Sequence, residues 1–145
     1  MMIIRLINFL FLLFFIISCS KNEELSGEDL WYSLNISNYE MIQQISCFCF
    51  PEEFISPKSI VVLNGDIHKI NGSEPSETIG FEYYSSINSL FEFIENTLKE
   101  NPEFFEINYN EKYGFPESIF FDMSEMIADE EIGYYITNFK ILNYD

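Results

Sequence analysis

The stretch with the clearest chemical potential is SCFCFPEE, residues 46–53, which places two thiols two residues apart in a chain with only three cysteines. In a strand, residues i and i+2 point the same way with Cα atoms about 6.5 Å apart, close to the upper limit for a disulfide. A bridge between Cys47 and Cys49 is therefore feasible but strained. It would close a very small ring, so stabilisation of the fold is not its main role.

Other roles for Cys47 and Cys49 compete with a local disulfide or a pair of buried thiols. A thiol-redox pair usually has Cys-x-x-Cys spacing at a helix N-terminus, which lowers the pKa of the attacking thiol, and that spacing is absent. A metal site would have only three ligands, because the single histidine is His68 and no fourth ligand is evident. The sequence favours the structural reading, keeps the redox pair as the alternative and predicts no metal.

Acidic residues form a second candidate cluster near the C-terminus, and they include Asp122, Asp129, Glu130 and Glu131. Calcium prefers several carboxylate oxygens in one loop, so a cation site is conceivable. The spacing does not match the Asp-x-Asp-x-Asp-Gly pattern of an EF-hand. A solvated acidic loop is the favoured interpretation, and a calcium-dependent module remains an alternative.

Motifs for catalysis are otherwise missing from the sequence. It contains no Gly-x-Ser-x-Gly, no His-Glu-x-x-His and no glycine-rich phosphate loop. We therefore predict that the protein is not an enzyme and carries no cofactor. A formal net charge of −17, from 24 acidic and 7 basic residues, repels nucleic acid and excludes it as a partner.

Composition also indicates a folded binding protein. The chain is 48% hydrophobic with 16 Phe and 9 Tyr, whereas disordered acidic chains are poor in aromatic residues. Aromatic side chains beyond the needs of a core are enriched at interfaces. We expect a non-enzymatic module that binds an unknown envelope protein or ligand across one face of a sheet.

The N-terminus predicts export. Residues 1–18 combine Arg5, a short apolar run and a small residue at the end, which is typical of a signal peptide and too short to span a bilayer. Residues 16–19, Ile-Ile-Ser-Cys, resemble the lipobox of bacterial lipoproteins. The resemblance implies cleavage before Cys19 and acyl chains such as palmitate on that cysteine, which would anchor the protein in the membrane. Ser20 in place of Asp resembles the signal for outer-membrane delivery.

Secondary-structure patterns divide the remaining chain into a tether at residues 19–27 and a single α+β domain at residues 28–145. Ser26 has N-cap spacing before a short helix, Asn64-Gly65 supplies the positive φ angles of a tight hairpin, and residues 86–98 have helical periodicity. Alternation predicts strands over residues 38–50, 104–110, 117–123 and 133–142, in addition to the hairpin.

This order is a helix followed by three strands, twice. It predicts an α+β fold with an antiparallel sheet of about six strands and two helices, with one sheet face buried under the helices. The repeated order suggests a duplicated αβββ unit.

Two motifs connect this chain to a known group of proteins. Cys47-Phe48-Cys49, and Tyr113-Gly114-Phe115-Pro116 followed by Asp122 and Asp129-Glu130, resemble an uncharacterised family of exported bacterial proteins, many of which look like lipoproteins. The likeness covers roughly residues 28–140 and implies no activity. Gly114 and Pro116 also predict a stiff connection between two strands.

Overall fold

The computed structural model describes residues 26–47, 50–127 and 129–143. The three helices are α2 (Gly27–Ser33), α3 (Glu52–Ile55) and α4 (Ile87–Lys99), and two short 3-10 turns cover Pro75–Glu77 and Phe81–Tyr83. The six strands are β1 (Tyr39–Ser46), β2 (Lys58–Leu63), β3 (Asp66–Ile70), β4 (Phe104–Tyr109), β5 (Pro116–Asp122) and β6 (Ile132–Ile141). The predicted α+β class with a six-stranded antiparallel sheet is confirmed.

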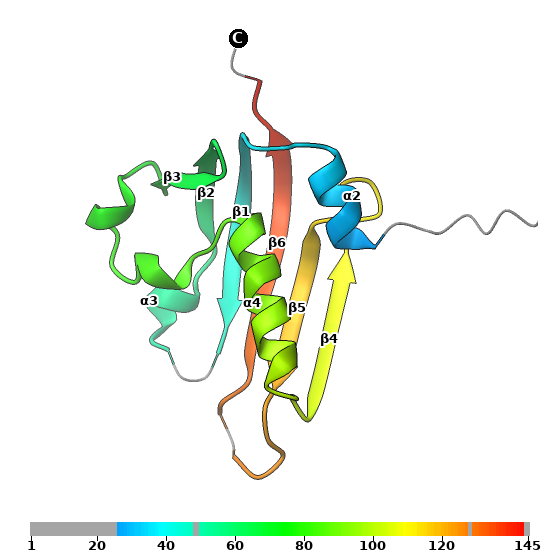
Figure 1. The fold of residues 1–145 in the computed structure, drawn as a ribbon. Helices are drawn as coiled ribbons and strands as arrows, with labels where there is room; N and C mark the ends of the chain where they lie inside the picture. The colour runs from blue at the N-terminus through cyan, green and yellow to red at the C-terminus, as the bar shows by residue number, and fades with distance from the viewer. Residues whose placement is uncertain (1–25, 48–49, 128, 144–145) are drawn as a thin grey trace, which may run out of the picture.

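The strand order is β3-β2-β1-β6-β5-β4. Each half of the chain forms an antiparallel meander of three strands, and the two meanders meet where β1 pairs with β6 at the centre of the sheet (Figure 1). A helix precedes each meander, so the order matches two αβββ units side by side. The first half differs by the short helix α3 between β1 and β2, which the sequence did not predict.

Both longer helices begin at a serine cap and lie on the same face of the sheet (Figure 1). The hydroxyl oxygen of Ser26 accepts a hydrogen bond from the backbone N–H of Asp29 at 3.1 Å, which satisfies one of the free donors at the start of α2. Ser86 does the same for the N–H of Ser89 at 3.3 Å. The buried residues of α4 are Ile87, Leu90, Phe91 and Ile94, which form one helical stripe against the sheet.

Trp31 joins α2 to the rest of the core. Its indole N–H donates to Oδ1 of Asn88 on α4 at 2.8 Å, and its ring makes edge contacts with Tyr39 and Phe139 at centroid distances of 5.6 and 5.9 Å. The indole is 2% exposed, so its one polar group is buried and satisfied. This contact network fixes the short helix α2 over one end of the sheet.

Gln43 is a polar residue at a position of β1 where the alternating pattern calls for an apolar one. It nevertheless lies on the buried face of the strand. It is 0% exposed. Its Nε2 donates to the carbonyl of Ser85 at 2.9 Å, and its Oε1 accepts from the N–H of Ser85, also at 2.9 Å. The side-chain amide thus pairs with both backbone polar groups of Ser85, in the segment leading into α4, and the burial of a polar residue is compensated.

The predicted turns are confirmed. Asn64 and Gly65 have φ angles of 54° and 89° and connect β2 to β3 directly. The connection between β4 and β5 is a compact turn in which the N–H of Asn110 donates to the carbonyl of Phe115 at 2.8 Å. Gly114 within it has a φ of 80°, a conformation that favours glycine.

Candidate functional site

The face of the sheet opposite α2 and α4 has no helix over it within the described part of the chain (Figure 1). We call the outward side of β4, β5, β6 and β1 the open face. Strand register places Ser118 directly opposite Tyr135, and Tyr135 directly opposite Gln44, so these side chains share one side of the sheet. The side chains of the open face are Phe104, Glu106, Asn108, Ser118, Phe120, Asp122, Tyr135, Thr137, Ile42, Gln44 and Ser46.

Three aromatic side chains, which we call the aromatic group, lie on the open face: Phe104 on the edge strand β4, Phe120 on β5 and Tyr135 on β6. Phe104 is 54% exposed, Tyr135 is 42% exposed, and the ring of Phe104 lies 6.1 Å from that of Phe120. Phe120 pairs with Gly133 on β6, where a Cβ atom would lie 3.8 Å from Cδ2 of Phe120. The phenylalanine ring therefore packs beside a position with no side chain of its own. Phe104 and Phe120 therefore form a pair of rings, and Tyr135 adds an exposed aromatic side chain on the neighbouring strand β6.

The border of the open face is acidic. Glu106 and Asp122 form no ion pair within residues that the structure describes, and Glu106 accepts a hydrogen bond only from the amide of Asn108, at 3.1 Å. Lys140, near the other end of β6, is paired with Glu40 at 3.2 Å. Carboxylates without a cationic neighbour give this face a negative potential, in keeping with the net charge of −17.

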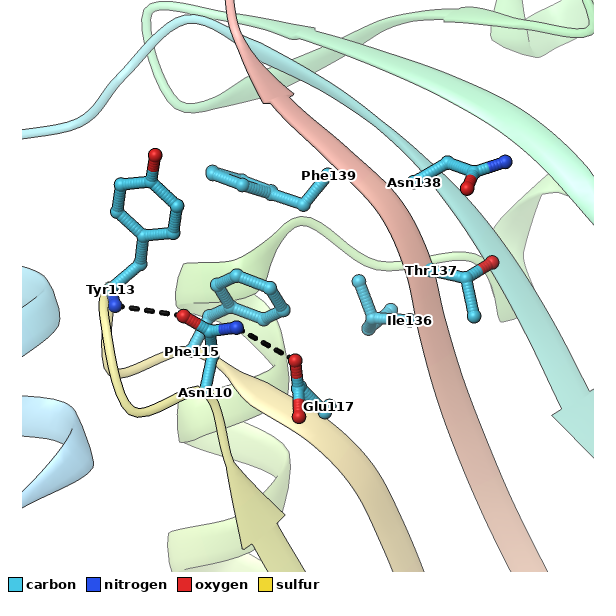
Figure 2. Close-up of a pocket in the computed structure, with 8 residues that line it drawn as sticks. All are labelled: Asn110, Tyr113, Phe115, Glu117, Ile136, Thr137, Asn138 and Phe139. Carbon is cyan, nitrogen blue, oxygen red and sulfur yellow. Dashed lines mark hydrogen bonds between the residues drawn. The ribbon is translucent and has the colours of Figure 1, made fainter.

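A pocket of about 280 Å³ opens where β5 and β6 separate. The two strands pair from Phe121 and Ile132 as far as Ser118 and Tyr135, beyond which β6 continues beside β1 alone. We call this space the β5–β6 pocket, and Figure 2 shows its lining: Asn110, Tyr113, Phe115, Glu117, Ile136, Thr137, Asn138 and Phe139.

Asn110 organises one wall of the β5–β6 pocket. Its Oδ1 accepts hydrogen bonds from the backbone N–H groups of Lys112 and Tyr113 at 3.1 and 2.8 Å, and its Nδ2 donates to Oε1 of Glu117 at 2.7 Å (Figure 2). One side chain thus holds the turn and fixes the carboxylate. Sequence analysis did not single out Asn110 or Glu117. An asparagine at the start of a turn was the available signal.

The second wall comes from β6, which carries an extra residue at this point. Two steps along β1, from Glu40 to Ile42, correspond to three steps along β6, from Lys140 to Thr137. Asn138 in that bulge has a φ of 52°. The bulge turns Phe139 toward the core, where its ring lies 4.5 Å from Phe115 and 5.3 Å from Tyr113.

The cysteines singled out in the sequence lie mostly outside the described residues. Cys19 and Cys49 both do, and so does the predicted signal peptide. Cys47 directly follows β1 and is 6% exposed. The Cys47–Cys49 bridge and the lipidation of Cys19 therefore stay predictions.

The acidic cluster is placed at the connection between β5 and β6. Asp122 ends β5, and its Oδ1 accepts from the N–H of Ser124 at 3.0 Å, which closes a local turn. Asp129 has a φ of 71°, and one carboxylate oxygen each of Glu130 and Glu131 is buried without a hydrogen-bond partner. Within the described ranges, no three side chains of the metal-binding types converge on one point.

No helix among the described residues has the length and apolarity needed to cross a membrane.

Comparison with known protein families gives a match over most of the chain. Residues 24–141 match a family described as a family of unknown function, DUF6174. No curated protein and no solved structure matches the chain.

Proposed function

The chain belongs to the DUF6174 family of unknown function, and we propose that it is a non-enzymatic binding module held in the bacterial cell envelope by lipid on Cys19. Its open face binds a protein partner that presents cationic side chains. The observation that carries this proposal is the aromatic group of Phe104, Phe120 and Tyr135, of which Phe104 and Tyr135 are exposed and Phe120 is half-buried, on a face without a covering helix in the described residues.

The aromatic group supports binding because of where its rings lie. Phe and Tyr side chains bring large apolar area to an interface, and the fully buried core of an interface is rich in them. Phe104 and Tyr135 are exposed although the helix side of the same sheet buries Phe121 and Ile119 completely. The core is therefore filled without them, and their apolar area is available to a partner.

The charge of the open face selects the partner. Glu106 and Asp122 lie beside the aromatic group without ion pairs in the described chain. An acidic or neutral partner would bury these carboxylates without compensation, whereas lysine and arginine side chains at the rim would compensate them. A cationic surface is thus the complementary one.

The test is site-specific photo-crosslinking of the full chain in its host cell. Benzoylphenylalanine at position 135 samples the open face, and at position 32 it samples the helix side, where Tyr32 is 48% exposed. We expect a discrete adduct with a basic protein from position 135 alone, weakened by added salt and by Phe104→Ser. Equal adducts from both positions, or an adduct that ignores salt and Phe104→Ser, would contradict the proposal.

The lipid anchor is tested separately by mass spectrometry of the protein purified from membranes. We expect the chain to begin at Cys19 and to carry acyl chains, and Cys19→Ser to release the protein from the membrane fraction. Detection of residues 1–18 on the purified protein, with Cys19 unmodified, would refute the anchor and leave the crosslinking result to decide the binding surface.

A further inference from the structure

We propose that the β5–β6 pocket is an arginine-binding site, which receives the guanidinium group of one side chain from an extended segment of a protein. That the arginine comes from the protein bound to the open face rests on the proposed function. The preference of the pocket for a guanidinium rests on the pocket alone.

The size of the β5–β6 pocket matches one side chain. Pockets for small molecules and cofactors usually enclose about 300–1,000 Å³. This pocket encloses about 280 Å³, below that range. It also adjoins the open face, because Thr137 lines the pocket and follows Tyr135 on the same side of β6. A protein lying on the open face can therefore place one residue in it.

The charge of the pocket favours a cation. Glu117 is exposed, forms no ion pair within the described chain, and uses Oε1 for the bond from Asn110, so its other oxygen can accept from a ligand. The bond from Asn110 holds the carboxylate in place before a ligand arrives, which lowers the entropic cost of binding. An anion would be repelled by Glu117.

The aromatic walls favour a guanidinium over a simple ammonium group. Tyr113 and Phe139 are half-buried rings at the pocket, and the buried ring of Phe115 lies next to both, at centroid distances of 6.4 and 4.5 Å (Figure 2). A planar guanidinium stacks on aromatic faces and hydrogen-bonds to a carboxylate in the same pose, whereas a lysine ammonium is more strongly hydrated. The ring of Tyr113 already attracts a cation, since Nζ of Lys112 lies 4.7 Å from its centroid.

The direct test is an NMR titration of the isotopically labelled full chain in detergent. The probes are N-acetyl-arginine amide and N-acetyl-citrulline amide, which have nearly the same shape and differ in charge. We expect arginine to shift the amide signals of Thr137 and Phe139, and citrulline to bind about tenfold more weakly or worse because the charge-assisted bond is lost. Equal binding of the two probes, or shifts confined to other residues, would overturn the proposal.

Two glutamate variants complete the test. Glu117→Gln removes the pocket carboxylate, and we expect it to weaken arginine binding about tenfold. Glu111→Gln removes the same charge from an exposed residue of the same turn that does not line the pocket, and we expect no change in affinity beyond twofold, as befits a screened surface charge. Equal effects of the two variants would mean that arginine responds only to net charge, and the site would be refuted.

The outcomes separate the two proposals. If arginine binds through Glu117 while crosslinking at position 135 finds no cationic partner, the pocket stands and the proposed function fails. If crosslinking succeeds and citrulline binds as well as arginine, the proposed function stands and the pocket proposal fails.

Discussion

Gly27 and Gly114 lie against each other where α2 meets the turn between β4 and β5, and a Cβ atom built on either one would collide with the carbonyl oxygen of the other. The backbones of α2 and the turn can approach this closely only because the residue at each contact position is a glycine without a side chain. The contact brings α2 onto the sheet, where Trp31 completes the core. The glycine in the Tyr-Gly-Phe-Pro motif is thus explained by packing as well as by its positive φ.

We predict that Gly114→Ala destabilises the fold by about 3 kcal/mol or more, because it adds a steric clash to the cost of a positive φ. Gly72→Ala is the matched control, since Gly72 has a similar φ of 84° and nothing within 4 Å of a Cβ atom. It should cost only about 1–2 kcal/mol. Urea denaturation measures both, and equal losses would mean that the contact with Gly27 contributes nothing.

Adjacent glutamines in β1 provide a second matched pair. Gln43→Met should destabilise the fold by about 2 kcal/mol, because it removes the hydrogen-bond partner of the N–H and carbonyl of Ser85 in a part-buried site. Gln44→Met, on the open face, should change the free energy of unfolding by less than about 0.5 kcal/mol. Denaturation curves give the free energy of unfolding of each variant. Similar losses for the two variants would mean that the hydrogen bonds of Gln43 do not stabilise the core.

Stability should fall at alkaline pH because of buried tyrosines. Burial raises the pKa of the Tyr84 hydroxyl from its ordinary value of about 10 to about 12, and desolvation also raises the pKa of Tyr39 and Tyr134. Above about pH 10 the unfolded chain loses phenolic protons that the folded chain keeps, so the free energy of unfolding decreases as pH rises from 10 toward 12. Below pH 10 this contribution is constant.

The measurement is the free energy of unfolding at several pH values from about 8 to 11. Tyr84→Phe should reduce the alkaline loss, since one titrating group is gone, although the variant also lacks the bond from the tyrosine hydroxyl to the carbonyl of Phe54 at 2.6 Å. If the free energy of unfolding of Tyr84→Phe falls as much at alkaline pH as that of the unmodified protein, the decrease is due to other groups.

Cys47 and Cys49 are expected to resist modification in the native protein, because Cys47 is 6% exposed and a local bridge or buried thiols do not react. Alkylation followed by mass spectrometry, with and without a denaturant, measures this. Fast native labelling that varies with the redox buffer would instead favour the thiol-redox alternative.

Calcium should leave the thermal midpoint unchanged at millimolar concentration. The acidic connection after β5 has no three metal-binding side chains converging among the described residues. A ligand that binds only the folded state would raise the midpoint, and magnesium serves as the control for nonspecific screening. A rise specific to calcium that disappears in Glu130→Gln would restore the cation-site alternative.

Local patterns predicted much of this fold. The periodicity of residues 86–98 gave helix α4, Asn64-Gly65 gave the hairpin, and alternation gave the later strands, because each signal depends on neighbours in the sequence. Alternation states which residues share a side, but it does not state which strand lies next to which. The pairing of β1 with β6 could therefore not be predicted from the sequence.

The candidate site was less predictable. An aromatic surplus indicated a binding face, yet Phe121 and Phe104 are both strand phenylalanines. The position of the helices and the place of each strand in the sheet decide that the first is buried and the second exposed. The β5–β6 pocket depends on an extra residue in β6 and on the hydrogen bond between Asn110 and Glu117. Neither leaves a periodic signal, since both arise from the meeting of distant segments.

The central pairing of β1 with β6 has a consequence for how the molecule assembles. Tyr39 pairs with Ile141, so the middle of the sheet closes only after almost the entire domain has been synthesised. Long-range strand pairing of this kind slows folding. Until β6 arrives, β1 is an unprotected edge on a half-built sheet, able to join strands of other molecules. Aggregation is therefore favoured while the chain is partly folded, and shielding of β1 by a chaperone would matter most then.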